Sequence, residues 1–377
     1  MQGHSHFAFI GWITMTLISL LVNYLEQHEV RTNYQKYHLI LKAHLYVSYA
    51  MLISFILEGY GLYSIILSTA TIFLSYIFMY HYLRDLRKVS STLFSKKWLK
   101  AALMLWAFSS LGAFSLAYLM ASHVNNQDLY VLAIYLFLHF QYNGWFLFAA
   151  MGLFYCFVEI KMNRQAPASK TQHLWGVLLF KWLSLLVVPS YFLSTLWLRM
   201  PSPIIWIAYL AAAGQIMIII CLVQWLSALP TAVWSSLSPQ NRLLWRLCAI
   251  AFTLKICLQA LSAIPALSQY AFGFRPIVIG YLHLAFIGII SFFIMGAILN
   301  LRLPIIRRYS KPGLMLFITG FVLQELILMI QGLEALKATS LTSAGMLLLY
   351  CAILMALGLM LITLKIIHNR TSKRGSS

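Results

Sequence analysis

The stretch His6-Phe7-Ala8-Phe9-Ile10-Gly11, which opens the first long apolar segment, returns far downstream as His283-Leu284-Ala285-Phe286-Ile287-Gly288. A looser copy, His139-Phe140-Gln141-Tyr142-Asn143-Gly144, lies between them. In each copy a glycine occupies the fifth position after the histidine, and each copy leads into about twenty mainly apolar residues. A histidine inside such a segment is energetically costly, so its recurrence in matched settings indicates a function.

The composition of the chain excludes an ordinary soluble domain. Hydrophobic residues make up 62% of the sequence and charged residues only 9%, with a mean hydropathy of +0.82. Backbone polar groups must bond to one another in hydrocarbon, and the alternating pattern of a transmembrane barrel is absent. The sequence therefore predicts an all-α, multi-pass membrane protein with a single membrane domain.

Clusters of charge, proline, glycine and asparagine divide the chain into eleven expected membrane spans. These spans cover residues 6–25, 39–57, 61–82, 99–121, 129–157, 174–195, 203–226, 244–264, 276–300, 313–333 and 342–366.

The positions of lysine and arginine predict the orientation of these spans, because retained loops carry the cationic excess. With the C-terminal tail (367–377) in the cytoplasm, 22 of the 27 cationic side chains fall on the cytoplasmic side. Three fall outside (Arg199, Arg275 and Lys337) and two within spans (Lys181 and Lys255). We expect the N-terminus to lie on the outer side and the protein to lie in the cytoplasmic (inner) membrane. Contact of the basic loops with anionic lipids explains the net charge of +19, so the charge does not indicate binding to nucleic acid.

The three histidine motifs predict an internal repeat. They fall in the first, fifth and ninth spans, a regular interval of four, and all three spans would run from outside to inside. A threefold pseudo-repeat explains this spacing, with divisions at residues 1–128, 129–275 and 276–366.

Haem iron held by two axial imidazoles needs histidines from two helices at equal depth, and a glycine one turn further on can admit a flat macrocycle. His6 with Gly11 and His283 with Gly288 meet this description. The alternative for either histidine is a hydrogen bond to a neighbouring helix. His4 projects to nearly the opposite side of a helix from His6, so it is an alternative ligand, a ligand of something else, or a water-exposed side chain.

These segments resemble the metal-binding helices of subunit I of the haem-copper oxidase superfamily, particularly the large subunit of nitric oxide reductases. In that family twelve helices form three pseudo-symmetric arcs, and the second, sixth and tenth bind metals. The first, fifth and ninth spans here match them if the family's first helix is missing. The resemblance implies that His6 and His283 bind one low-spin haem b, and that His139 lies where the family binds a non-haem metal.

The departures from the family are equally informative. Tyr281 stands where the family has the high-spin haem ligand, Asn143 stands where it has an acidic residue, and the sixth span lacks its pair of histidines. We therefore expect a degenerate binuclear centre without a second haem, copper or iron, and at most a vestigial metal site at His139. The resemblance implies electron transfer, or binding of NO or oxygen, with a quinol or cytochrome donor and other membrane subunits as partners. It leaves any catalysed reaction unassigned.

Three charged residues lie inside expected spans: Lys181, Lys255 and Glu325. They indicate either a proton path or quinone pocket, or an interhelical Lys–Glu pair. Arg275 could neutralise a haem propionate or anchor its span at the interface. A second class of function stays open, in which the chain is a non-haem transporter or an assembly factor for a respiratory complex and these groups line a path.

Overall fold

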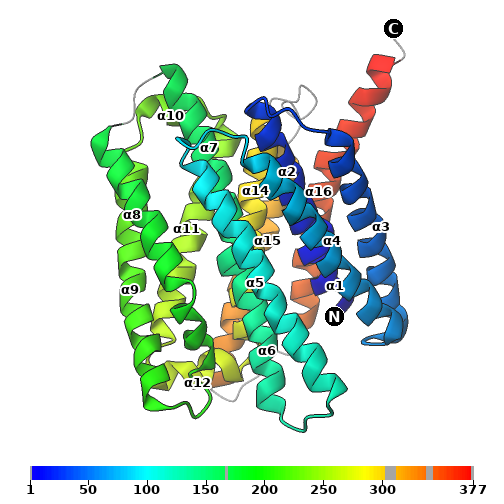
Figure 1. Cartoon of the computed structure of the whole chain (residues 1–377). Helices are drawn as coiled ribbons and strands as arrows, with labels where there is room; N and C mark the ends of the chain where they lie inside the picture. Colours follow the sequence, from blue (N-terminus) through cyan, green and yellow to red (C-terminus); the bar gives the residue numbers. More distant parts are fainter. Residues whose placement is uncertain (1, 166–168, 302–310, 337–342, 375–377) are drawn as a thin grey trace. The chain divides into compact units, whose positions relative to one another are not determined.

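The computed structural model describes residues 2–165, 169–301, 311–336 and 343–374 (Figure 1). The chain is 87% helical, and the described residues contain no strand. The predicted all-α fold is therefore confirmed. Four cations used to predict the orientation, Arg302, Arg307, Arg308 and Lys337, lie outside the described residues.

The chain forms two compact units, Met1–Val187 (unit 1) and Val188–Ser377 (unit 2). Within unit 1, the side chains of Asn33 and Asn126 cap the N-termini of α3 and α6. Its elements are α1 (Gln2–Phe7), η1 (Ala8–Thr14), α2 (Met15–Gln27), α3 (Tyr34–Glu58), α4 (Leu62–Leu86), α5 (Ser95–Ala121), α6 (Gln127–His139), η2 (Phe140–Phe146), α7 (Leu147–Gln165) and α8 (Lys170–Leu186).

In unit 2, prolines recur in the first turn of helices, where their missing N–H costs no hydrogen bond. The short helices α10 and α12 were not expected from the sequence. The elements of unit 2 are η3 (Pro189–Thr195), α9 (Ser202–Ser227), α10 (Thr231–Ser235), α11 (Pro239–Leu261), α12 (Pro265–Gly273), α13 (Arg275–His283), η4 (Leu284–Ser291), α14 (Phe292–Asn300), α15 (Lys311–Leu336) and α16 (Ala344–Arg374).

Ten helices among the described residues are long and apolar enough to cross a membrane, or up to eleven if a bent pair counts as one span. The ten agree with ten of the expected spans. The sixth expected span, 174–195, is not one continuous helix, because it breaks after Leu186 and bends by 49° into the 3₁₀ turn that begins at Pro189. Proline cannot donate the backbone hydrogen bond that would continue the helix.

Three π-helical segments interrupt the α-helices: η1, η2 and η4. Within the described part of the chain, π-helix occurs only in these places, and each follows one of the three motif histidines. His139 and His283 are the last residues of α6 and α13, and His6 is the last but one of α1. A π turn holds one more residue than an α turn and often lies at a functional site.

The spans that contain the π segments are also the most buried. In the most apolar 18-residue window of each, 44%, 67% and 67% of the residues are buried, against 11% to 39% in the other single-helix spans. The motif spans therefore supply more of the packed interior than their neighbours do.

Candidate functional site

His6 is held by two aromatic residues of unit 1. Its ring stacks on Phe55 of α3, with centroids 4.4 Å apart and planes at 16°. Its Nε2 lies 3.3 Å from the hydroxyl of Tyr60, in the α3–α4 loop. Gly59, with a φ of 63°, starts this loop in a backbone conformation that favours glycine. His4 is exposed, and its role stays a prediction.

His139 is buried, and both of its ring nitrogens have protein partners in unit 1. Nε2 lies 2.7 Å from the backbone oxygen of Val187, and Nδ1 lies 3.1 Å from the side-chain amide nitrogen of Asn143. With the Asn143 amide donating to Nδ1, the proton is on Nε2 and is donated to Val187. Asn143 thus fixes the ring. No group of three or more His, Cys, Asp or Glu in the described ranges could hold a metal ion.

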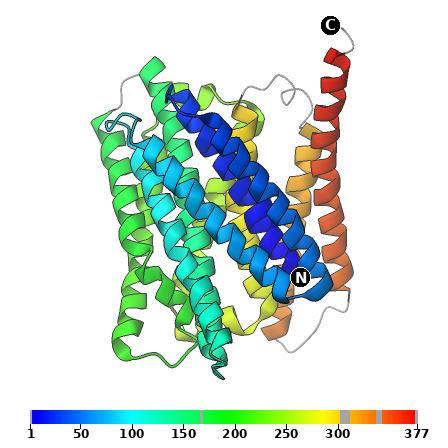
Figure 2. The same cartoon turned by 45° about the vertical axis from the view of Figure 1, so that its right-hand side comes forward.

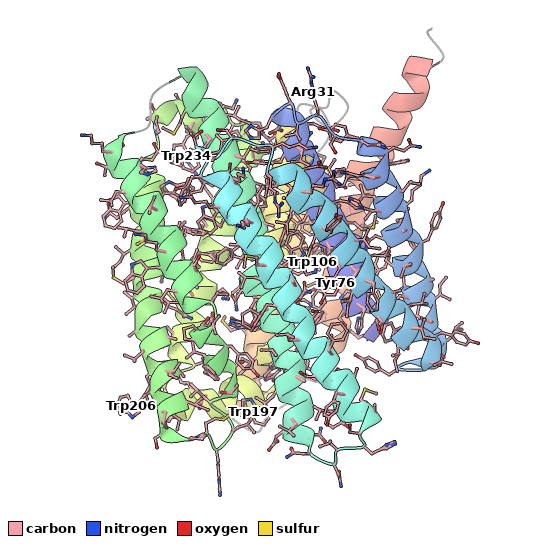
Figure 3. All side chains as sticks on the ribbon, in the orientation of Figure 1. Arg31, Tyr76, Trp106, Trp197, Trp206 and Trp234 are labelled. Atoms are coloured by element: carbon pink, nitrogen blue, oxygen red, sulfur yellow. The ribbon has the colours of Figure 1, made fainter. Side chains whose placement is uncertain are left out.

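The first two motif copies meet inside unit 1. The indole Nε1 of Trp145 donates to the hydroxyl of Thr14 at 3.5 Å, which joins η2 to η1. The rings of Phe9 and Phe146 lie 6.3 Å apart between the same segments. Trp145 also stacks on Trp106 of α5, labelled in Figure 3, with centroids 4.2 Å apart and nearly parallel planes. The two π segments therefore share one aromatic interior.

His283 is fixed from the neighbouring helix of unit 2. Its Nδ1 lies 2.8 Å from the side-chain amide of Gln324 on α15. The amide can donate to Nδ1 or, turned over, accept from an Nδ1–H. Sequence reasoning singled out Glu325 but missed the adjacent Gln324, although both polar residues interrupt the same apolar helix. Arg275, the first residue of α13, is exposed and lies about two turns before His283.

The motif glycines allow close packing in the structure. A Cβ added to Gly288 would lie 3.0 Å from Phe321 of α15 and 3.1 Å from Ala251 of α11. A Cβ added to Gly11 would lie 2.7 Å from the ring of Phe7. Aromatic side chains thus cover both positions, and the expectation that a macrocycle approaches the backbone there stays a prediction.

The first and third copies have the same backbone hydrogen bond at the same motif position. Met15 donates its N–H to the oxygen of Ile10, and Phe292 donates to that of Ile287. In both cases the donor is the ninth residue after the histidine and the acceptor the fourth. The first and third copies therefore resemble each other in backbone hydrogen bonding as well as in amino-acid sequence.

The charged residues predicted to lie inside spans have different settings. Lys181 is exposed on α8. Lys255 is buried in unit 2, and its Nζ donates to the Oε1 of Gln259 at 2.6 Å, while the hydroxyl of Tyr281 lies 3.4 Å from the same oxygen. Glu325 has a buried Oε1 without a hydrogen-bond partner. That oxygen is not paired with a lysine in the described part of the chain.

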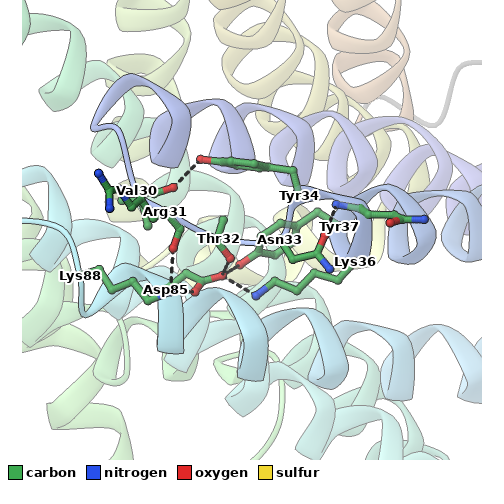
Figure 4. A network of polar contacts seen from close by, with 10 residues as sticks. Val30, Arg31, Thr32, Asn33, Tyr34, Lys36, Tyr37, Asp85 and Lys88 are labelled. Atoms are coloured by element: carbon green, nitrogen blue, oxygen red, sulfur yellow. Dashed lines mark hydrogen bonds and ion pairs between the residues drawn. The ribbon is translucent and has the colours of Figure 1, made fainter.

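Asp85 forms a polar cluster that sequence reasoning missed (Figure 4). Its buried carboxylate accepts from Thr32 at 2.5 Å, Lys36 at 2.5 Å, Tyr37 at 2.8 Å and Lys88 at 2.8 Å. Asp85 is one of only eight acidic residues in the chain, and it lies between basic residues at the end of an apolar segment. That position in the sequence could have indicated the cluster. The cluster ties α3 and the loop before it to the end of α4.

No protein-family model matches the chain, and no curated protein matches it. The resemblance to haem-copper oxidases therefore stays a prediction from the three motif segments and the order of the spans.

Proposed function

We propose that the chain is a haem-binding membrane redox protein, related to subunit I of the haem-copper oxidases, in which His6 and His283 bind one low-spin haem b. The observation that carries the proposal is the matched position of the motif histidines, each at the junction of an α-helix with a π segment in one of the three most buried single-helix spans. Intramembrane histidines are costly, and three in one backbone setting favour a shared functional origin.

The surroundings of His283 fit axial ligation. A histidine that binds a metal through one ring nitrogen usually has the other fixed by a hydrogen bond, and Gln324 lies at Nδ1. An amide N–H that donates to Nδ1 leaves the ring proton on Nε2, so ligation through Nε2 requires the turned-over amide. Turned over, the Gln324 amide accepts the Nδ1 proton and makes the imidazole a better ligand. Arg275 is exposed and would supply a cation for a propionate.

The surroundings of His6 fit the same tautomer. When Tyr60 donates to Nε2, the imidazole proton is on Nδ1, as ligation through Nε2 requires. Burial raises the pKa of Tyr60, so its hydroxyl keeps the proton that it donates. A bound haem would supply a one-electron couple for transfer from a quinol or cytochrome donor. His139, with both nitrogens occupied, holds α6 to the end of α8 instead.

The proposal includes an arrangement of the spans in three pseudo-symmetric arcs, with the N-terminus outside and the C-terminus in the cytoplasm. The cytoplasmic membrane is the proposed location, and other membrane subunits are proposed partners. The excess of cations in the expected inner loops supports the orientation.

An absorption spectrum tests the haem proposal. Full-length protein purified after expression with adequate haem should show a Soret band and the split α and β bands of a low-spin haem. His6→Ala and His283→Ala should each abolish the low-spin spectrum. His139→Ala and His38→Ala, the second an exposed position on α3, should leave it unchanged. A wild-type protein without haem, or a low-spin spectrum that survives both ligand substitutions, would contradict the proposal.

A non-haem transporter or assembly factor is the second candidate. The buried Lys255–Gln259–Tyr281 group favours it, because a polar network inside a membrane helix bundle often lines a path for ions or substrates. A wild-type protein that lacks haem, together with a growth defect from Lys255→Met, would favour this candidate over the first.

A further inference from the structure

A row of aromatic rings crosses the interior of unit 1. Trp145 of η2 stacks on Trp106 of α5, with centroids 4.2 Å apart and planes at 5°. The ring centroid of Phe78 on α4 lies 6.2 Å from that of Trp106 and 6.0 Å from that of Tyr37 on α3. We call these four residues the aromatic row. All four are buried, with at most 5% of their surface exposed.

The row joins four elements that pack against one another in unit 1. The segment η2 lies beside α5, α5 contacts α4, and α4 lies beside α3 (Figures 1 and 2). Trp145 lies near the middle of its span, Gln127–Met162, whereas Tyr37 lies in the first turn of α3. The row therefore runs from the middle of a membrane span to the end of unit 1 that contains the Asp85 cluster.

The stacked indoles are the part of the row that favours the loss of an electron. Packed aromatic pairs usually have centroids roughly 4.5–7 Å apart. The rings of Trp106 and Trp145 are closer and nearly parallel, so their π systems overlap. A positive charge over the face of an indole is attracted by the π electrons of the ring. The positive charge left on one indole by a lost electron is therefore stabilised by the other indole.

Two tyrosines flank Phe78, and they differ in their proton acceptors. The hydroxyl of Tyr37 donates to Asp85 at 2.8 Å, within the cluster of Figure 4. Tyr82 stacks on Phe78 with centroids 5.3 Å apart, but its buried hydroxyl has no hydrogen-bond partner among the described residues. An oxidised phenol carries a positive charge and becomes strongly acidic, so its oxidation is easier beside a proton acceptor. The geometry therefore favours Tyr37 over Tyr82 as the tyrosine that is oxidised.

Asp85 can receive the proton of Tyr37. Its carboxylate is paired with Lys36 at 2.5 Å and with Lys88 at 2.8 Å, and these two cations keep it ionised. The side chain of Lys88 is 47% exposed, so the cluster borders water. A water-soluble reductant can therefore approach this end of the row. The transfer of an electron between packed rings needs no cavity.

We propose that the aromatic row carries single oxidising equivalents from the Trp106–Trp145 pair to Tyr37, and so protects unit 1 from lipid peroxyl radicals. A peroxyl radical takes one electron from the indole pair and one proton from water, and becomes a hydroperoxide. Tyr37 then gives an electron to the oxidised pair as its O–H bond breaks and the proton passes to Asp85.

A reductant in the water completes the cycle. Ascorbate gives one electron to the tyrosyl radical and releases its own proton to the water, while the proton on Asp85 returns to the phenol oxygen of Tyr37. The net reaction converts one peroxyl radical and one ascorbate into a hydroperoxide and an ascorbyl radical, and the row is left unchanged. The proposal stands on unit 1 alone and does not depend on haem.

Peptide mass spectrometry of radical-treated proteoliposomes tests the proposal. Vesicles of unsaturated lipid that contain the full chain, with ascorbate on both sides, are treated with a lipid-soluble azo initiator, and oxygenated Trp106 and Trp145 are measured. In Tyr37→Phe the positive charge stays on the indole pair. Oxidation of the pair should therefore rise about tenfold over the wild type, because no hydrogen bond to a charged acceptor favours transfer to position 37.

Matched controls separate the relay from packing. Tyr82→Phe removes the other hydroxyl beside Phe78 and should leave the oxidation of the pair unchanged. Trp98 is buried on the same helix as Trp106 and is the internal reference, since its ring neighbours are Phe148, Tyr155 and Phe180. Its oxidation should be equal in all variants. A rise at Trp98 along with the pair would mean that the substitution loosens the fold, and would overturn the proposal.

Heavy water tests the proton step without any substitution. Transfer of a deuteron from Tyr37 to Asp85 is slower than transfer of a proton, so D2O should raise the oxidation of the indole pair in wild-type protein and not in Tyr37→Phe. Equal oxidation of the wild-type pair in H2O and D2O would overturn the proposal. So would Tyr37→Phe that matches the wild type, or a rise of the same size in Tyr82→Phe.

Discussion

At the scale of single residues, His6 has a protein partner that competes with a metal. The hydroxyl of Tyr60 lies at the Nε2 that iron would bind, so the hydrogen bond must open before ligation. The ring of Tyr60 also packs edge-on against Phe55, with centroids 5.2 Å apart. The hydroxyl and the ring therefore have separable roles, the first in holding the imidazole and the second in shaping its pocket.

Tyr60→Phe should tighten haem binding. The substitution removes the competing hydroxyl and keeps the aromatic packing, and a net hydrogen bond of about 0.5–1.5 kcal/mol corresponds to roughly twofold to twelvefold in affinity. Titration of haem-free protein with haem, followed by absorbance, measures the change. Tyr63→Phe, at an exposed position on α4, is the control. Weaker binding by Tyr60→Phe would mean that the hydroxyl supports ligation rather than competing with it.

At the scale of elements, the sequence predicted the spans well because apolar length is a local property of the chain. The bend at Pro189 could have been expected from the proline itself. The π segments could not, since the one-residue shift in periodicity that they introduce cannot be read in spans that are apolar almost throughout. Tyr60 and Gln324 were missed for a related reason: both meet their histidines only through the packing of helices that the sequence does not place.

Deletion of one residue from a π segment should be tolerated by the fold. A π turn accommodates an extra residue without rotating the flanking helices, so its removal leaves a regular helix with both ends facing as before. Deletion of Ile10 or Ile287, the fourth residue after each histidine, should thus cost less thermal stability than deletion of Ala212. The latter lies in the regular helix α9, where every residue on one side would turn by about 100°.

The same deletions test whether the wide turn serves the site. We expect the Ile10 and Ile287 deletions to lose haem, because the wide turn beside each histidine is gone, while their unfolding temperatures stay close to that of haem-free wild type. Thermal unfolding and the absorption spectrum are measured on the same preparations. If the two deletions destabilise the protein as much as the Ala212 deletion does, the segments are required for folding and not for the site alone.

At the scale of the whole molecule, the asymmetry of charge makes the orientation of unit 1 testable. The loop that follows α4 contains Lys88 and belongs to the basic end of this unit, whereas the loop between α5 and α6 is uncharged up to Asp128. Because cations favour the cytoplasmic side, Ser90→Cys should be protected from a membrane-impermeant maleimide in intact cells, and Ser122→Cys should be labelled. Both serines are exposed, and a Cys257→Ser background removes the exposed native thiol. Permeabilised cells should label both positions. Labelling of Ser90→Cys alone in intact cells would reverse the proposed orientation and place the Asp85 cluster on the outer side.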